Sequence, residues 1–158
     1  MHHLDLREIV TDSVRKLEVH FQNKNQRLNM QISDEAVPIY ADRGKIQQVI
    51  INLLTNAIKY TPENGNIRIS AQVVDKNAIF EVQDSGIGIP KEDIKRIFER
   101  FYRVDKGRSR AQGGTGLGLS IAHNIIKQHK GSIKVSSELE KGSIFTVYFP
   151  VDNSVDIL

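Results

Sequence analysis

Apolar residues recur with a spacing of three and four positions in three stretches of the chain, which is the pattern of helices with one buried face. The pattern predicts helices over about 5–25, 43–60 and 116–130. Asp42 is placed to be the N-cap of the second helix, although Lys45 stands where a capping box would have an acid. Gly131 is placed to end the third as a C′ residue.

Alternating apolar and polar residues between these helices predict strands, and Gly, Pro, Asn and Asp mark the turns. A short helix is expected at 91–98, followed by a long polar loop at 99–115 of the kind that is functional or mobile. Adjacent strands in this order favour a mixed, mostly antiparallel sheet covered on one face by helices, so we expect a two-layer α/β sandwich in a single domain. The strands are predicted at 27–32, 37–41, 66–74, 78–83, 132–136 and 144–149.

Composition narrows the class of protein without naming a function. The chain has 158 residues, 39% of them hydrophobic and 26% charged, as in an ordinary globular domain. Its formal charge is +3 and its basic residues are spread out, which argues against a nucleic-acid surface. It has no cysteine. No apolar run approaches the roughly 20 residues of a membrane span, and no signal peptide opens the chain.

The predicted second helix carries a row of polar residues, Asn52, Asn56 and Lys59, on a face separate from its apolar stripe. Such a row is compatible with a solvated surface. It is also compatible with one wall of a nucleotide site, because an amide oxygen such as that of Asn56 suits Mg²⁺ in a shell completed by waters and phosphates.

Two glycine-rich stretches follow that helix. Asp84-Ser-Gly86-Ile-Gly88 directly follows a predicted strand; it reads as a plain turn, or as a pocket in which an aspartate accepts a hydrogen bond from an exocyclic amine. The stretch 113–120 ends the long loop and opens a helix, so it suits either a hinge or a phosphate site at a helix N-terminus. It lacks the Gly-Lys-Ser/Thr of a Walker loop.

Four ordered motifs, at 52–61, 84–89, 98–103 and 114–119, resemble those of the catalytic and ATP-binding domain of bacterial sensor histidine kinases, in the wider group of gyrase, Hsp90 chaperones and MutL. The resemblance covers about 5–150, is strongest for Gram-positive phosphate- and cell-wall-sensing kinases, and implies the Bergerat fold with a mobile ATP lid. A weaker fifth element is 142–146. The motifs are Asn52-Leu-Leu-Thr-Asn56-Ala-Ile-Lys59-Tyr60-Thr61, Asp84-Ser-Gly86-Ile-Gly88-Ile89, Phe98-Glu-Arg-Phe101-Tyr102-Arg103 and Gly114-Thr-Gly116-Leu-Gly118-Leu.

The resemblance also implies residue roles. Asn56 would hold Mg²⁺, with Asn52 near the phosphates of ATP. Phosphate oxygens would be contacted by Lys59 and Arg103, joined from the lid by Arg108 or Arg110. The adenine and ribose side would be formed by Tyr60, Asp84, Gly86, Gly88, Ile89 and Thr146, and the phosphate end by Thr115, Gly116, Leu117 and Gly118. Phe98 and Phe101 would either link lid closure to docking or simply pack in the core.

One departure from the family pattern concerns the phosphoacceptor. The family phosphorylates a histidine within a His-Glu-x-x-Thr/Asn-Pro-like context, and none of the five histidines here has that context. We therefore expect a fragment without the phosphoacceptor, sensor and membrane segments. Residues 1–4 would be a tag or linker remnant, 5–150 the catalytic domain and 151–158 a tail. The fragment would be monomeric, make no membrane contact, and belong to the cytoplasmic part of a membrane-anchored sensor.

Asn52 separates the possible activities. The resemblance places a glutamate there in related ATPases, where it activates water, and an amide cannot take a proton at neutral pH. A histidine nucleophile needs no such base, because its imidazole already has a lone pair. Transfer of the γ-phosphoryl group of Mg-ATP to a phosphoacceptor domain, with a response regulator downstream, is therefore the expected function. A nucleotide-sensing module, an ATPase and a serine kinase remain the alternatives.

Overall fold

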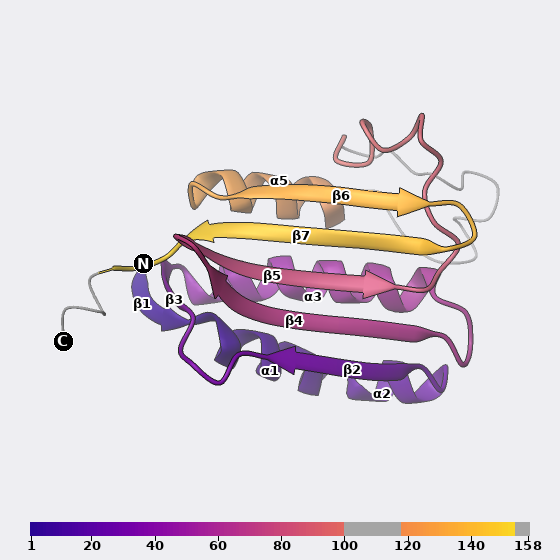
Figure 1. Cartoon of the computed structure of the whole chain (residues 1–158), viewed down its shortest axis with the longest axis horizontal. Helices are drawn as coiled ribbons and strands as arrows, with labels where there is room; N and C mark the ends of the chain where they lie inside the picture. The colour runs from indigo at the N-terminus through magenta and orange to yellow at the C-terminus, as the bar shows by residue number, and fades with distance from the viewer. Residues whose placement is uncertain (100–117, 154–158) are drawn as a thin grey trace.

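The computed structural model describes residues 1–99 and 118–153. One layer is a five-stranded sheet in the order β2-β4-β5-β7-β6, in which β2 and β4 are parallel and the other pairs are antiparallel. The other layer is the set of helices behind that sheet (Figure 1). The predicted two-layer α/β sandwich with a mixed, mostly antiparallel sheet is confirmed. The described elements are β1 (His2–Asp5), α1 (Leu6–Lys16), α2 (Glu18–Asn23), β2 (Arg27–Ile32), β3 (Pro38–Ala41), α3 (Arg43–Tyr60), β4 (Asn66–Val74), β5 (Asn77–Asp84), α5 (Gly118–Gln128), β6 (Ser132–Glu138) and β7 (Gly142–Pro150).

The core lies between the sheet and the helices, and α3 packs between α1 and α5. The apolar stripe of α3 is buried in this core, as its spacing predicts. Asp42 caps α3 by accepting a hydrogen bond from the backbone N–H of Lys45 at 3.2 Å, so the predicted N-cap is confirmed. The polar side of α3 is thereby fixed relative to the sheet.

The predicted first helix is in fact two helices. Leu17 separates α1 from α2, with φ −103° and ψ 5°, and its backbone N–H bonds to the carbonyl of Val14. The apolar spacing continues across this break, because Phe21 of α2 is buried in the same core as Val14 of α1. Periodicity alone therefore could not reveal the interruption.

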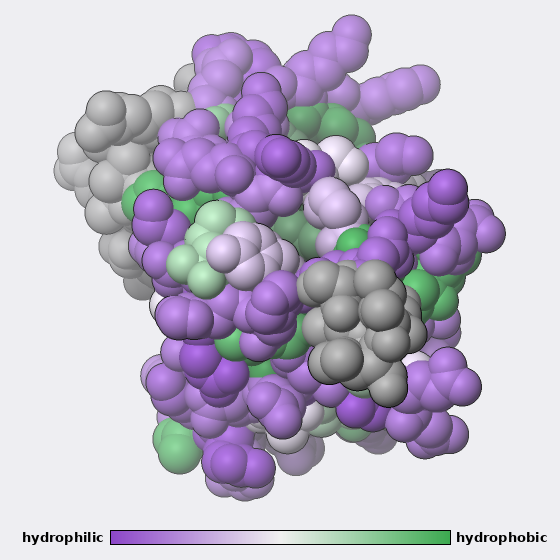
Figure 2. All heavy atoms as spheres, turned by 90° about the vertical axis from the view of Figure 1, so that its left-hand side faces the viewer, coloured by the Kyte–Doolittle hydropathy of each residue, from purple (hydrophilic) through white to green (hydrophobic). Residues whose placement is uncertain are grey.

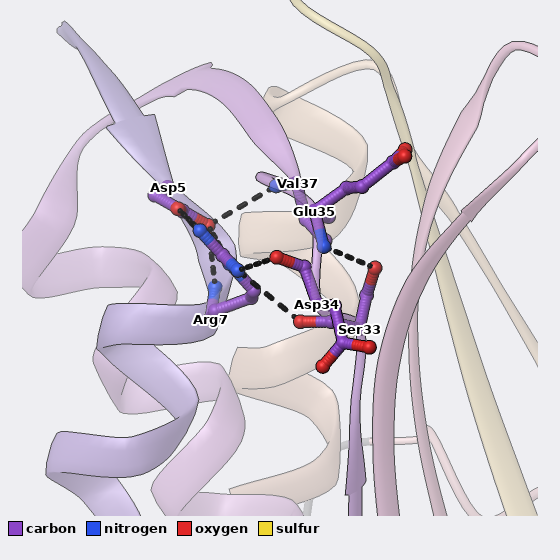
Figure 3. Close-up of polar contacts among 6 residues, drawn as sticks. All are labelled: Asp5, Arg7, Ser33, Asp34, Glu35 and Val37. Carbon is purple, nitrogen blue, oxygen red and sulfur yellow. Dashed lines mark hydrogen bonds and ion pairs between the residues drawn. The ribbon is translucent and has the colours of Figure 1, made fainter.

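Asp5 and Arg7 fasten the start of α1 to the connection between β2 and β3 (Figure 3). The Asp5 carboxylate accepts hydrogen bonds from the backbone N–H groups of Arg7 and Val37, both at 3.1 Å. The Arg7 guanidinium pairs with Asp5 at 2.8 Å and donates to the carbonyls of Ser33 and Asp34. These hydrogen bonds, led by that from Arg7, hold the pKa of Asp5 below its ordinary value, although burial opposes them.

Residues 1–4, which we expect to be a tag or linker remnant, include most of strand β1. His2–Asp5 pairs antiparallel with β3, and His3 makes a hydrogen-bonded contact with Asp152. The backbone N–H of Asp152 also donates to the Pro38 carbonyl at 2.9 Å. This end of the molecule shows a mostly hydrophilic surface (Figure 2). No helix in the described parts of the chain is both long enough and apolar enough to cross a membrane.

Two further local predictions are wrong. Residues 91–98 form consecutive turns with hydrogen bonds such as Asp93 N–H to Pro90 O, and not a helix. At the end of α5, the left-handed residue is Lys130, with φ 59°, and not Gly131. Gly131 is one position later, where its N–H donates to Ile126 O at 2.9 Å and completes the last turn.

Candidate nucleotide-binding site

The C-terminal half of α3 presents the polar row predicted from the sequence. Asn52, Asn56, Lys59 and Tyr60 are all half-buried. The Asn52 amide donates to the carbonyl of Gly118, the first residue of α5, at 3.1 Å. The bond therefore joins the polar row to the last glycine of the second glycine motif, although the two are far apart in sequence.

Asn56 and Lys59 differ in what they contact. The Asn56 carboxamide makes no side-chain hydrogen bond to the part of the chain that the structure describes, so its oxygen is available to a ligand. The Lys59 ammonium lies 5.7 Å from the centre of the Tyr60 ring, a cation–π distance. One turn of α3 thus carries an amide oxygen, a cation and an aromatic ring.

Asp84 ends β5 as a buried carboxylate, 6% exposed. Its Oδ1 accepts a hydrogen bond from the backbone N–H of Gly86 at 2.8 Å, and the backbone N–H of Ser143 also donates to it. Burial raises the pKa of Asp84 above its ordinary value, and these two hydrogen bonds oppose that rise. Burying a carboxylate that has few hydrogen-bond partners costs folding free energy, and buried titratable groups of this kind are candidates for ligand binding.

The turn after β5 lies against the end of α3, and Gly86 makes this approach possible. A Cβ at Gly86 would collide with the backbone carbonyl of Tyr60 and would lie 2.7 Å from Asp84 Oδ1. The N–H of Ile87 points at that same Tyr60 carbonyl, at 3.4 Å. Asp84 and the Tyr60 turn of α3 are therefore held together by a contact that only glycine allows.

The other side of the turn is fastened to the hairpin between β6 and β7. Gly88 adopts φ +75°, and a Cβ there would collide with the carbonyl of Glu138. The Ile89 N–H donates to the Ser137 hydroxyl at 2.7 Å, and the Ile87 carbonyl accepts from the N–H of Glu140 at 2.9 Å. Gly86, Gly88 and Ile89 consequently form one rigid turn.

The structure does not bring Thr146 to this group. Thr146 pairs with Glu81 across β5 and β7 and donates to its carboxylate at 3.1 Å. Successive residues of a strand point to opposite faces, so Thr146 lies on the sheet face away from Asp84. The residue of β7 that contacts Asp84 is Ser143, its partner in register and itself 5% exposed. Sequence reasoning missed Ser143, which only the strand register identifies.

Phe98 makes a contact that the sequence did not predict. Its ring stacks on that of His123 in α5, with centroids 5.1 Å apart and an interplanar angle of 19°. Burial, followed by the charge of Lys127, lowers the pKa of His123 below its ordinary value. The segment that follows the Asp84 turn is therefore docked on α5 before it enters the stretch 100–117.

Several predicted site residues lie outside the described residues. They are Phe101, Arg103, Arg108, Arg110, Thr115, Gly116 and Leu117. The residues that the structure does bring together are those of α3, the turn after β5 and the first residue of α5. A separate hollow of about 540 Å³ lies at the other end of α3, between Arg43 and α1, and mixes both signs of charge (Arg15, Glu8 and Asp12). We do not assign the nucleotide to it.

The fold and the site together define an α/β nucleotide-binding domain built on α3, the turn after β5 and α5. Residues 41–153 match the family described as histidine kinase-, DNA gyrase B- and HSP90-like ATPases. The chain belongs to this family.

Its relatives within the family are sensor kinases. It is 50% identical, over 105 residues, to the signal transduction histidine-protein kinase ArlS of Staphylococcus aureus strain USA300; the match covers 66% of this chain and 23% of ArlS. It also resembles the catalytic domain of the histidine kinase ThkA, with a TM-score of 0.83 and 31% identity over 94% of each chain. A structure of ThkA in complex with the response regulator TrrA matches 96% of this chain and 42% of that one, with a TM-score of 0.79 and 30% identity.

Proposed function

We propose that this domain binds Mg-ATP beside α3 and transfers the γ-phosphoryl group to a histidine of a separate phosphoacceptor domain. The observation that carries the proposal is Asn52, held by Gly118 at the junction of the two motifs. The resemblance places the water-activating glutamate of related ATPases at this position. An amide there can donate and accept hydrogen bonds but cannot remove a proton from water.

Adenine recognition is assigned to Asp84 and the turn around Gly86. The buried carboxylate keeps acceptor capacity beyond its two backbone hydrogen bonds, which suits an exocyclic amine. The absence of a side chain at Gly86 lets the turn lie against the Tyr60 carbonyl, which holds Asp84 beside the end of α3. Gly88 and Ile89 shape the same turn. Thr146 is left out of this assignment, because it faces away from Asp84.

Mg²⁺ fits the donor set of α3 if phosphate oxygens and waters supply the rest of its shell. Asn56 offers the oxygen, and the described residues contain no cluster of three or more His, Cys, Asp or Glu side chains that would make a metal site by itself. Mg²⁺ would neutralise charge on the phosphates. Asn56 is therefore its proposed protein ligand.

The phosphate end is assigned to Lys59 and Gly118 together with residues outside the described ranges. Lys59 and Arg103 would contact phosphate oxygens, with Arg108 or Arg110 joining them, and Thr115, Gly116, Leu117 and Gly118 would offer backbone N–H groups. In the transfer, the unprotonated imidazole nitrogen forms a bond to the γ-phosphorus while the bond from that phosphorus to the β,γ-bridging oxygen breaks. The leaving oxygen departs as part of ADP, and the role of the protein is positioning and charge stabilisation.

The partners follow from the same proposal. The match covers 23% of ArlS, and we propose that a sensor and a phosphoacceptor domain act together with this domain. We propose a response regulator as the downstream partner, on the likeness to ThkA. Because ATP is the phosphoryl donor, we place the domain in the cytoplasm.

The test is to mix the domain with Mg-ATP and a separately made phosphoacceptor hairpin from a sensor kinase of the same type. Acid-labile, base-stable phosphohistidine on the hairpin supports the proposal. Asp84→Asn, with adenine recognition weakened, should give much less label at the same ATP concentration, and Asp34→Asn, on an exposed loop, should behave like the wild type.

The alternatives give different results in the same assay. Rapid phosphate release without the hairpin would indicate an ATPase and overturn the kinase proposal. Phosphoserine on an added protein would indicate a serine kinase. Nucleotide binding with no transfer and no hydrolysis would indicate a sensing module.

A further inference from the structure

The C-terminal end of α3 is capped by side chains and not by a glycine. A helix leaves its last four carbonyl groups without intrahelical partners. Here these belong to Ile58, Lys59, Tyr60 and the C-cap Thr61, which is extended, with φ −93° and ψ 128°. An extended C-cap provides none of the backbone hydrogen bonds of a glycine-terminated helix.

Residues from the connection between α2 and β2 satisfy three of these four carbonyls. The Lys24 ammonium donates to Ile58 O at 2.8 Å and to Lys59 O at 3.3 Å. The Gln26 amide donates to Ile58 O and to Thr61 O, both at 2.9 Å. The fourth carbonyl, that of Tyr60, faces the N–H of Ile87 in the turn after β5.

The connection that carries Lys24 and Gln26 is itself fastened to the chain that leaves α3. The backbone N–H of Asn64 donates to Lys24 O at 3.0 Å, and the N–H of Arg27 donates to Gly65 O at 2.8 Å. The side chains of Asn25 and Asn64 bond to each other at 2.7 Å. The Lys24 ammonium is therefore delivered from a fixed segment, and it sits where the helix dipole favours a cation.

This cap costs more folding free energy than the capping of a helix end requires. Gln26 Oε1 and the Thr61 hydroxyl are both buried without a hydrogen-bond partner among the described residues. Unsatisfied buried polar atoms are avoided in folded proteins. A glycine and a turn would end a helix without burying them, so the arrangement indicates that the position of this helix end matters more than its stability.

We infer that Lys24 is a positioning residue of the nucleotide site, acting through the last turn of α3 to orient Lys59 toward phosphate, with Gln26 supporting it. The inference rests on the proposed function, because it needs Lys59 to contact the nucleotide. Lys24 holds the backbone carbonyl of Lys59 itself, so its loss shifts the backbone from which that side chain extends. Small misplacements of a charged group lower affinity steeply.

The test is a double-mutant cycle on Mg-ATP affinity, measured by calorimetric titration of the folded domain. Lys24→Met removes the ammonium and keeps the stem, and we expect about tenfold weaker binding. Lys24→Arg restores donors for the same carbonyls and should recover most of the affinity. Lys16→Met is the matched control, because its ammonium also bonds to α3, through Gln47 at 3.2 Å, but near the opposite end of the helix. It should bind like the wild type.

The cycle is closed by Lys59→Met. If Lys24 acts through Lys59, then Lys24→Met costs less than about twofold in the Lys59→Met background. Gln26→Met repeats the test if Lys24→Met does not fold. The same loss in both backgrounds would overturn the inference, as would unchanged affinity in Lys24→Met or in Lys59→Met alone. Each of these outcomes leaves phosphoryl transfer to histidine standing, although unchanged affinity in Lys59→Met would also remove Lys59 from the proposed phosphate contacts. Absence of Mg-ATP binding by the wild type would overturn both.

Discussion

Replacing Asp84 by Asn should make the domain more stable and a worse nucleotide binder at the same time. The carboxylate is 6% exposed, and burial is the largest influence on its pKa, which is raised. An ionised group in this position costs folding free energy, because water solvates it better in the unfolded chain. Asn has nearly the same shape and no charge, so it removes that cost.

The loss of binding follows from the hydrogen bonds at the site. In the variant, the one remaining oxygen has to accept from Gly86 N–H, as it does at 2.8 Å in the wild type, and from Ser143 N–H as well. The new NH₂ group then faces the adenine amine, and two donors oppose each other. A buried donor left without an acceptor costs roughly 1–3 kcal/mol, so we expect Mg-ATP to bind roughly 10- to 100-fold more weakly. On stability we expect a gain of about 1 kcal/mol, or about 2–4 °C in Tm.

The pH dependence of the free energy of unfolding provides a second check that ionised Asp84 destabilises the folded domain. For an acid whose folded pKa is raised, the folding cost is absent below the ordinary value of 3.8 and grows as pH rises through the raised pKa. The stability advantage of Asp84→Asn should therefore be largest at neutral pH and shrink on acidification. Urea unfolding from pH 8 downward, with Asp34→Asn as the exposed control, measures it. A variant that is less stable than the wild type at neutral pH, or that keeps full Mg-ATP affinity, would refute the reasoning.

Three other changes probe separate parts of the molecule. Asn56→Ala should weaken nucleotide binding about tenfold with Mg²⁺ and little with EDTA, because only a metal ligand is lost; equal titrations of variant and wild type would remove the metal assignment. His123 has a lowered pKa, so the fold favours its neutral form and stability should be lost as pH falls below 6.5. His123→Phe, which keeps a ring for stacking, should flatten urea midpoints between pH 7.5 and 5.5, and parallel curves would contradict this. His129 bonds to Ile125 O at 2.8 Å and accepts a hydrogen bond from the backbone N–H of Asp42, the N-cap of α3, at 3.2 Å. His129→Ala should therefore lower the free energy of unfolding in urea by about 1–3 kcal/mol, whereas the control His20→Ala, at an exposed position, should leave it unchanged.

Features set by neighbouring residues could be predicted from the sequence. The Asp42 cap, the buried stripe of α3 and the glycine turn after β5 each depend on local chemistry within a few residues. The short helix expected at 91–98 is the exception. Its spacing is helical, but the structure forms only turns there, because tertiary context outweighs weak local preference in short segments.

Features set by distant pairing could not be predicted. Ser143, and not Thr146, meets Asp84 because of the register between β5 and β7, and a shift of one residue exchanges the two faces of a strand. Lys24 reaches a carbonyl 34 positions further along the chain, which no local pattern encodes. β1 has four residues and none of them is buried, so alternation could not distinguish it from a tail.

The two faces of the sheet are under different constraints. The face toward the helices carries Asp84 and the core, whereas Glu81 and Thr146 bond to each other on the opposite face. Lys134 lies on that same opposite face and is exposed. Among the described elements, helices cover only one side of the sheet (Figure 1). Substitutions on the uncovered side leave Asp84 and the core untouched, so that side can carry a surface of its own without altering the site.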